Sequence, residues 1–99
     1  MSPTSTKTET DPKTALAPRW KVILHDDPVT SFPFVLGVLR QVFAKSQVEA
    51  YRITKEAHET GSAVADVLPL EQAEFRRDQV HSLARAEGYP LTVTLEPAD

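Results

Sequence analysis

The sequence predicts an α+β fold in which three helices cover one face of a small three-stranded antiparallel sheet. Three short segments, at 20–24, 63–67 and 91–95, are rich in apolar residues and bounded by turn-forming residues, as strands are. Longer segments between them carry apolar residues at helical spacing behind capping residues. The expected order of elements is therefore β-α-α-β-α-β.

The first strand ends at residues 25–28, His-Asp-Asp-Pro, because aspartate disfavours strands and proline cannot continue a hydrogen-bonded ladder. Thr30 or Ser31 can cap the helix that follows, and Pro33 suits its first turn. This helix has one apolar stripe, which we assign to the core: Phe34, Val35, Val38, Leu39, Val42 and Phe43.

The second helix begins at a capping box, Ser46 to Glu49, and ends at Gly61, which suits the left-handed conformation that closes helices. Its expected inward residues are Val48, Tyr51, Ile53 and Ala57. After the small-residue strand at 63–67, Pro69 opens a third helix that Gly88 and Pro90 end. Strict alternation over 91–95 predicts a final strand with one buried face.

Composition divides the 99 residues into two parts and excludes several classes of protein. Residues 1–18 hold five Thr, two Ser and three Pro with few apolar residues, so we expect a disordered tail before one folded domain at 19–97. The chain has no cysteine for disulfides, thiolate zinc sites or a thiol nucleophile. A net charge of −3 argues against nucleic-acid binding.

The sequence also bears on location. No apolar run of about 18 residues is present to span a membrane. The N-terminus lacks the basic and then apolar pattern of a signal peptide. Together with the absence of cysteine, these features favour a cytoplasmic protein whose partners are proteins or small molecules.

Candidate chemistry is concentrated at His25, Asp26 and Asp27. One interpretation is a solvated turn in which Asp27 helps to cap the next helix. The other is a cation site, because carboxylates and an imidazole can accept hydrogen bonds from an ammonium group or bind a metal ion. The apolar turn Phe32 to Val35 adjoins this loop, and a positive group beside an apolar side chain describes the N-terminal residue of a peptide.

Two other histidines have alternative interpretations. His58 can be explained by the preference of an imidazolium for a helix C-terminus, and His81 is expected on the surface of the third helix. If His58 converged with the residues at 25–27, a metal-dependent hydrolase would be an alternative function. The chain has no H-E-x-x-H spacing, glycine-rich phosphate loop or G-x-S-x-G elbow.

A series of short motifs extends through residues 20–97. They are WKVILHDD at 20–27, Thr30, FVxxVLxxxF at 34–43, EAxRI at 49–53, AHxxGxA at 57–63, ExAE at 71–74 with Arg76, VxxxAR at 80–85, PL at 90–91 and TxE at 94–96. In this order and spacing the chain resembles the ClpS family, bacterial adaptors that deliver N-degron substrates to the Clp AAA+ protease.

The resemblance implies a ClpS-like adaptor domain over 19–97, without catalytic residues, metal or cofactor. It implies that the free α-amino group of a substrate is received by His25, Asp26, Asp27, Thr30 and His58. It implies that the side-chain pocket, which takes Leu, Phe, Tyr or Trp, is formed by Phe32, Val35, Val38, Thr54, Ala57 and Leu91.

The chain departs from the family pattern at the site. His25 replaces the usual Asn, Phe32 replaces the gating Met, and the loop over 28–31 is one residue longer. Thr54 and Ala57 stand where Met and Val commonly line the pocket, so its floor is smaller and more polar. A ClpS-fold regulator that has lost N-degron binding therefore remains an alternative.

For delivery, the resemblance implies that Glu71 and Arg76 dock onto the N-terminal domain of a ClpA- or ClpC-like ATPase. From the residues alone, a solvated helix face explains the same two charges. The tail at 1–18 resembles the extension that the ATPase pore engages in the family. We expect a monomer.

Overall fold

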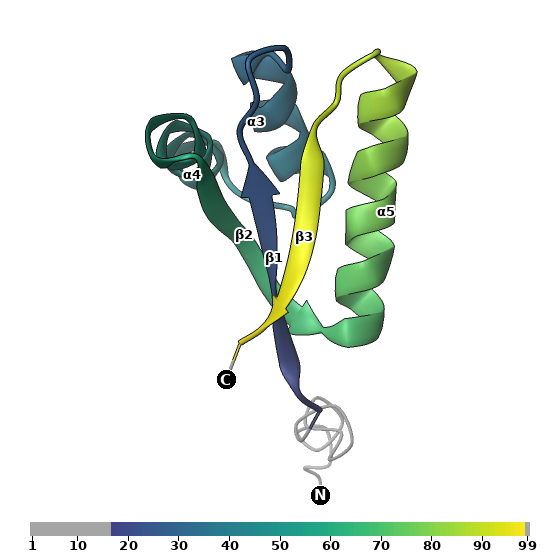
Figure 1. The fold of residues 1–99 in the computed structure, drawn as a ribbon. Coiled ribbons are helices and arrows are strands. Elements are labelled where there is room, and N and C mark those ends of the chain that lie inside the picture. Colours follow the sequence, from purple (N-terminus) through teal and green to yellow (C-terminus); the bar gives the residue numbers. More distant parts are fainter. Residues whose placement is uncertain (1–16, 99) are drawn as a thin grey trace, which may run out of the picture.

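The computed structural model describes residues 17–98 and contains three strands and three helices (Figure 1). In chain order they are β1 (Arg19–His25), α3 (Phe32–Gln41), α4 (Gln47–Thr60), β2 (Ser62–Pro69), α5 (Leu70–Ala86) and β3 (Thr92–Pro97). The strands form one antiparallel sheet in the order β2-β1-β3. The predicted fold class and element order are confirmed, whereas the predicted tail lies outside the described residues except for its last two positions, 17 and 18.

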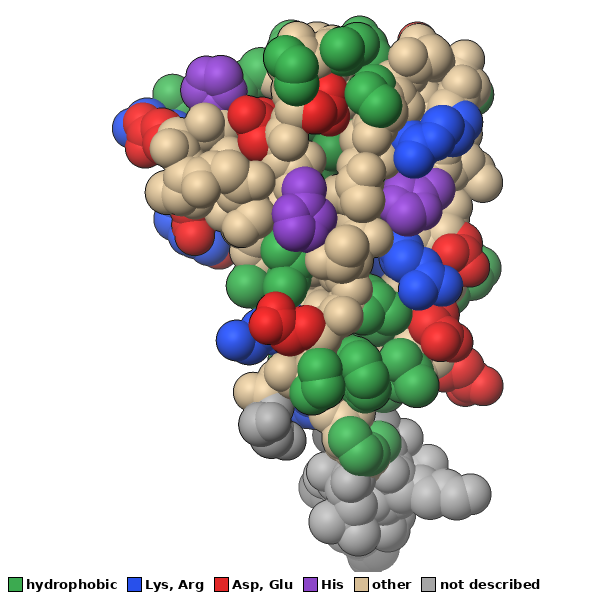
Figure 2. All heavy atoms as spheres, in the orientation of Figure 1, with side chains coloured by type: hydrophobic (Ala, Val, Ile, Leu, Met, Phe, Trp, Pro, Cys, Tyr) green, Lys and Arg blue, Asp and Glu red, His purple; other side chains and the backbone are tan. Residues whose placement is uncertain are grey.

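The helices lie against one face of the sheet, and the other face is open (Figures 1 and 2). Helix α5 packs against all three strands, and α4 packs against β2 and α3. Alternation along β1 turns Val22 and Leu24 toward the helices, where they join Leu39, Ile53 and Val80 in the core. Burying one such side chain contributes about 1.5 to 3 kcal/mol to the stability of the fold, so these contacts hold the helices against the sheet.

The predicted helix caps are confirmed at the atomic level. Ser31 is the N-cap of α3, where its hydroxyl accepts a hydrogen bond from the Phe34 N–H at 3.2 Å. Ser46 does the same for the Glu49 N–H of α4, at 3.1 Å. Gly61 ends α4 with φ of 101°, a conformation that a residue with a Cβ rarely adopts.

The expected inward face of α4 is wrong at two positions. Val48 is 79% exposed and Tyr51 is 51% exposed. The buried stripe instead consists of Ala50, Ile53, Thr54 and Ala57, which follow the i, i+3, i+4, i+7 spacing of one helix face. Three of these four side chains are small, so α4 approaches the sheet closely and turns its larger apolar residues outward.

His81 is also placed differently from the expectation that it lies on the helix surface. Its Nε2 accepts a hydrogen bond from the Val93 N–H at 2.9 Å, which joins α5 to β3. Burial is the main cause that lowers the pKa of His81, and the guanidinium groups of Arg85 and Arg77 lower it further. The neutral ring that results keeps a lone pair for this bond.

None of the helices within residues 17–98 is long and apolar enough to cross a membrane.

Candidate functional site

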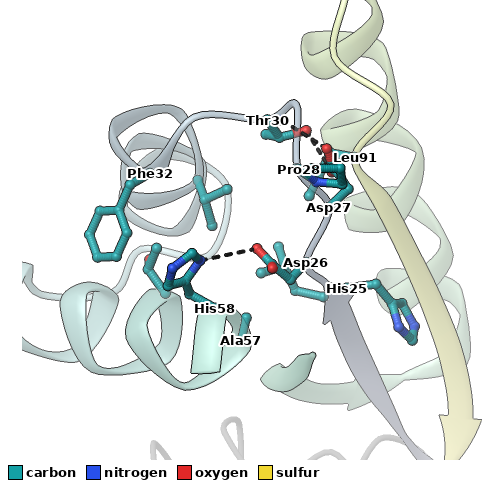
Figure 3. Close-up of a pocket in the computed structure, with 12 residues that line it drawn as sticks. His25, Asp26, Asp27, Pro28, Thr30, Phe32, Ala57, His58 and Leu91 are labelled. Atoms are coloured by element: carbon teal, nitrogen blue, oxygen red, sulfur yellow. Dashed lines mark hydrogen bonds and ion pairs between the residues drawn. The ribbon is translucent and has the colours of Figure 1, made fainter. Parts of the chain in front are cut away.

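A pocket of about 540 Å³ lies where the end of β1, the loop after it and α4 meet (Figure 3). Its volume is in the range of small-molecule and side-chain binding sites. It combines a polar rim with an apolar interior. The lining residues are Leu24, His25, Asp26, Asp27, Pro28, Thr30, Phe32, Val35, Thr54, Ala57, His58 and Leu91.

Asp26 and His58 face each other across the rim (Figure 3). The Asp26 N–H donates to the Gly61 carbonyl at 3.0 Å, which fixes the end of β1 against the end of α4. His58 lies in the last turn of that helix, so the two side chains meet with Oδ1 and Nδ1 3.8 Å apart. The imidazole is 70% exposed, so a ligand can reach it.

The gap between Asp26 and His58 defines what this rim can bind. A separation of 3.8 Å is longer than a hydrogen bond, which spans about 2.7 to 3.2 Å. A carboxylate accepts hydrogen bonds only, and a neutral imidazole accepts at one nitrogen. A group with several N–H donors, such as a primary ammonium, could therefore bond to both side chains at once.

The Asp27 carboxylate forms hydrogen bonds within its own loop and does not face His58 as Asp26 does. Its Oδ1 accepts from the N–H groups of Val29 and Thr30 at 2.9 and 2.7 Å, and its Oδ2 accepts from the Thr30 hydroxyl at 2.7 Å. Burial raises the pKa of the Asp27 carboxyl, but these hydrogen bonds outweigh it, so the pKa lies below its usual value. The carboxylate is ionised and holds residues 27–30 as a tight turn.

His25 lines the pocket, but its imidazole is directed away from Asp26, toward β3 (Figure 3). Its Nε2 lies 2.7 Å from the Thr94 Oγ1. The histidine side chains reach the surface at separate places (Figure 2). Within residues 17–98 no three His, Asp or Glu side chains lie close enough together to hold a metal ion. His25, Asp26, Asp27 and His58 share the pocket, but the metal-binding cluster that the hydrolase alternative requires is not found among the described residues.

Apart from Thr54, the interior of the pocket is apolar. Leu24, Val35, Ala57 and Leu91 are buried and form its walls. Thr54 is 3% exposed, and its hydroxyl donates to the Ala50 carbonyl at 2.7 Å.

Phe32 stands at the entrance of the pocket, and its ring lies 5.6 Å from that of Tyr51. These two aromatic side chains are partly exposed, so they extend the apolar surface outward from the pocket along α4.

All the residues expected at the amino-group site and the side-chain pocket line this cavity, except Val38. Val38 lines a smaller groove between α3 and α5 instead. Leu24 and Pro28 were not anticipated as lining residues. Leu24 could have been found from strand alternation, because it faces the helices directly before His25. Pro28 gave no signal beyond that of a turn.

Glu71 and Arg76 lie on α5, away from this pocket. Pairing of Arg19 with Pro69 brings the start of α5 to the start of β1, whereas the pocket lies at the end of β1 (Figure 1). Glu71 is exposed in the first turn of the helix. The Arg76 guanidinium lies 5.3 Å above the ring of Phe75, which is 61% exposed.

Fold and site together define a small α+β binding domain that presents carboxylate and imidazole acceptors at the mouth of an apolar pocket. Residues 15–94 match the family model described as ATP-dependent Clp protease adaptor protein ClpS. The chain is 46% identical over 90 residues to the ATP-dependent Clp protease adapter protein ClpS of Desulfatibacillum aliphaticivorans, which covers 91% of this chain and 86% of that protein. This chain therefore belongs to the ClpS family of Clp protease adaptors.

Two further comparisons agree with this assignment. The ClpS adapter of Nautilia profundicola is 39% identical over 94 residues, which cover 95% of this chain and 97% of that one. Among solved structures, Agrobacterium tumefaciens ClpS2 bound to L-phenylalaninamide matches with a TM-score of 0.78 and 36% identity, over 81% of this chain and 96% of that chain.

Proposed function

We propose that this protein is an N-degron adaptor: it binds the free α-amino group and the bulky apolar side chain of a substrate's first residue and delivers the substrate to a Clp AAA+ ATPase. The observation that carries the proposal is the pair Asp26 and His58 facing each other at the mouth of an apolar pocket. The ligand of Agrobacterium tumefaciens ClpS2, L-phenylalaninamide, joins an α-amino group to an aromatic side chain, which supports the proposal.

The ammonium group is recognised by complementary hydrogen bonding. It has three N–H donors, and the 3.8 Å gap between Asp26 and His58 allows two of them to bond to different acceptors. Bonds between an ammonium and a carboxylate are stronger than bonds between neutral groups. Asp27 adds negative charge nearby while it holds the loop through Val29 and Thr30.

The side chain of the first residue is recognised by burial. Val35, Ala57 and Leu91 form the buried walls of the pocket below the rim. When the amino group is bound at the rim, the side chain of the same residue therefore enters the space between these walls. Removing a large apolar side chain from water contributes about 1.5 to 3 kcal/mol. Leu, Phe, Tyr and Trp supply this contribution, whereas small or charged first residues do not.

Delivery requires a second surface that leaves the pocket free. We assign it to the first half of α5, which carries Glu71 and Arg76 and begins at the far end of the sheet from the pocket. Charged groups at such a surface set orientation and association rate more than affinity. The partner is the N-terminal domain of a ClpA- or ClpC-like ATPase, and the protein acts as a monomer.

A panel of labelled peptides that differ only at the first residue tests the binding half of this proposal by fluorescence anisotropy. Peptides that begin with Phe, Tyr, Trp or Leu should bind, and those that begin with Ala or Glu should not. Acetylation of the α-amino group removes its charge and two of its three donors. Loss of a hydrogen bond to a charged group costs about 1.5 to 3 kcal/mol, so affinity should fall at least about tenfold.

Equal affinity for free and acetylated peptides would contradict the amino-group site. Binding of no peptide would instead support the alternative of a ClpS-fold regulator that has lost N-degron recognition. Asp26→Asn provides the matched control in the protein, because it keeps the size of the side chain and removes its charge.

A further inference from the structure

We infer that Thr54 makes this pocket selective for a first residue with a hydrogen-bond donor at the end of its side chain, so that N-terminal Tyr is preferred over N-terminal Phe. The inference deepens the proposed function and rests on it. It starts from an unusual feature of the core: Thr54 is the only buried polar side chain in residues 17–98.

Thr54 lies deep in the pocket, in line with the amino-group site. Thr54, Ala57 and His58 follow the i, i+3, i+4 spacing of one helix face, and all three line the cavity. His58 is mostly exposed at the rim, whereas Thr54, four residues earlier and therefore about 6 Å away along α4, is 3% exposed. A side chain whose amino group is held at His58 therefore extends past Ala57 toward Thr54.

The hydrogen-bonding state of Thr54 determines which ligand atom it can meet. A hydroxyl has one proton and two lone pairs. The proton is used in the bond to the Ala50 carbonyl at 2.7 Å. The Thr54 Oγ1 can therefore only accept a further hydrogen bond. It can accept one from an O–H or N–H group of a ligand, but it forms no hydrogen bond with an apolar ring.

The remaining buried walls strengthen this selection. Leu24, Val35, Ala57 and Leu91 present apolar side chains to the pocket. A phenol that entered walls of this kind without an acceptor would lose its hydrogen bond to water and bind less tightly than a phenyl ring. With Thr54 in the floor, the phenol replaces that bond.

The test compares two peptides that differ by one hydroxyl, with Tyr or Phe as first residue, by isothermal titration calorimetry. A neutral hydrogen bond corresponds to roughly a twofold to tenfold difference in affinity, so the unmodified protein should bind the Tyr peptide tighter by that factor. In Thr54→Val the acceptor is lost, and the ratio should fall to one or below. Thr54→Ser keeps the hydroxyl and should keep the preference.

Thr60→Val is the matched control. Thr60 makes the same kind of bond within α4, from its hydroxyl to the Glu56 carbonyl at 2.9 Å, but it does not line the pocket. This variant should leave the Tyr to Phe ratio unchanged. Thermal unfolding of each variant establishes that it is folded under the conditions of titration.

The outcomes separate this inference from the proposed function. If both peptides bind, but the unmodified protein does not prefer Tyr or Thr54→Val keeps the preference, the role of Thr54 is wrong and the adaptor function stands. If neither peptide binds the unmodified protein, the proposed function and the inference both fail.

Discussion

Asp26 and Asp27 are adjacent in the chain, but the structure gives their carboxylates different tasks. Asp27 accepts three hydrogen bonds from Val29 and Thr30 within its own loop. Asp26 is exposed, and its Oδ1 lies 3.8 Å from the Nδ1 of His58, beyond hydrogen-bond distance. Because one carboxylate holds the turn, the other is free to face a ligand.

This division predicts opposite effects for two alanine substitutions. Asp27→Ala removes the three loop hydrogen bonds and should lower the free energy of unfolding by about 1 to 3 kcal/mol. For a domain of this size, each kcal/mol lowers the thermal midpoint by about 4 to 8 °C. Asp26→Ala should change stability by less than about 0.5 kcal/mol, yet abolish peptide binding.

Thermal unfolding and peptide anisotropy, measured on both variants, check this prediction. An Asp27→Ala protein as stable as the unmodified one would show that the loop does not depend on these bonds. An Asp26→Ala protein that still binds N-terminal Phe would remove Asp26 from the amino-group site.

The candidate residues at the rim can be predicted from the sequence, but the orientations of their side chains cannot. The types and positions of His25, Asp26, Asp27 and His58 are enough to place them at one end of a strand and a helix. The direction of a side chain at the end of a strand depends on its hydrogen-bond partner. The partner of His25 is Thr94 on β3, which is far away in the sequence. Asp27 is directed by the conformation of residues 28–30, which propensities do not determine.

At the scale of the elements, the link between α5 and β3 determines one wall of the pocket. Arg85 donates from Nη1 to the carbonyls of Tyr89 and Leu91, at 2.8 and 2.9 Å. His81 accepts from the Val93 N–H at 2.9 Å. These bonds fix the connection between α5 and β3, and with it the Leu91 side chain that faces the pocket.

The His81 bond predicts a pH dependence of stability. Burial together with Arg85 and Arg77 lowers the pKa of His81 in the folded protein, and Asp78 opposes this shift. Below the usual value of 6.5 the unfolded chain then binds more protons than the folded one. The contribution of His81 to stability is therefore complete above about pH 6.5 and is lost as the pH falls below it.

Thermal midpoints at pH 8 and pH 5.5 measure this effect. His81→Ala should be less stable than the unmodified protein at pH 8, because the Val93 N–H loses its partner. The variant should also lose less of its stability between the two pH values. A variant whose midpoint falls as steeply as that of the unmodified protein would assign the pH dependence to other groups.

The elements illustrate what local sequence can and cannot predict. Ser46 and Gly61 are predictable as helix boundaries, and the N-cap of α3 can be narrowed to Thr30 or Ser31, because capping depends on neighbouring backbone groups. The exposure of Val48 and Tyr51 was missed because the rotation of α4 is set by close packing of small residues against β2. Hydrophobicity alone predicts that the larger apolar residues of α4 face inward. The contact between α4 and β2 places the small residues there instead.

At the scale of the whole molecule, the proposed substrate and ATPase surfaces lie at opposite ends of the sheet. Helix α5 has 17 residues and is therefore about 25 Å long. Glu71 lies in its first turn and Arg76 in its first half, and Arg85, which holds Leu91 in the pocket wall, lies near its end. A substrate and an ATPase could therefore contact the domain at the same time.

This separation predicts that binding and delivery can be uncoupled. Glu71→Lys with Arg76→Glu reverses two charges at the proposed docking surface, one exposed and one half-buried. Affinity for an N-terminal Phe peptide should remain unchanged, while degradation of an N-degron substrate by the partner Clp protease should slow, most strongly at low salt. Full degradation activity in this double variant would place the docking surface elsewhere.

The central claim is that the rim formed by Asp26 and His58 holds an α-amino group while the pocket below holds the attached side chain. A crystal structure of the protein with a peptide that begins with Phe tests it most directly. The α-amino nitrogen should lie about 2.7 to 3.2 Å from an Asp26 carboxylate oxygen, with the ring between Val35, Ala57 and Leu91. An amino group away from both rim residues, or a ring in the groove between α3 and α5, would contradict the claim.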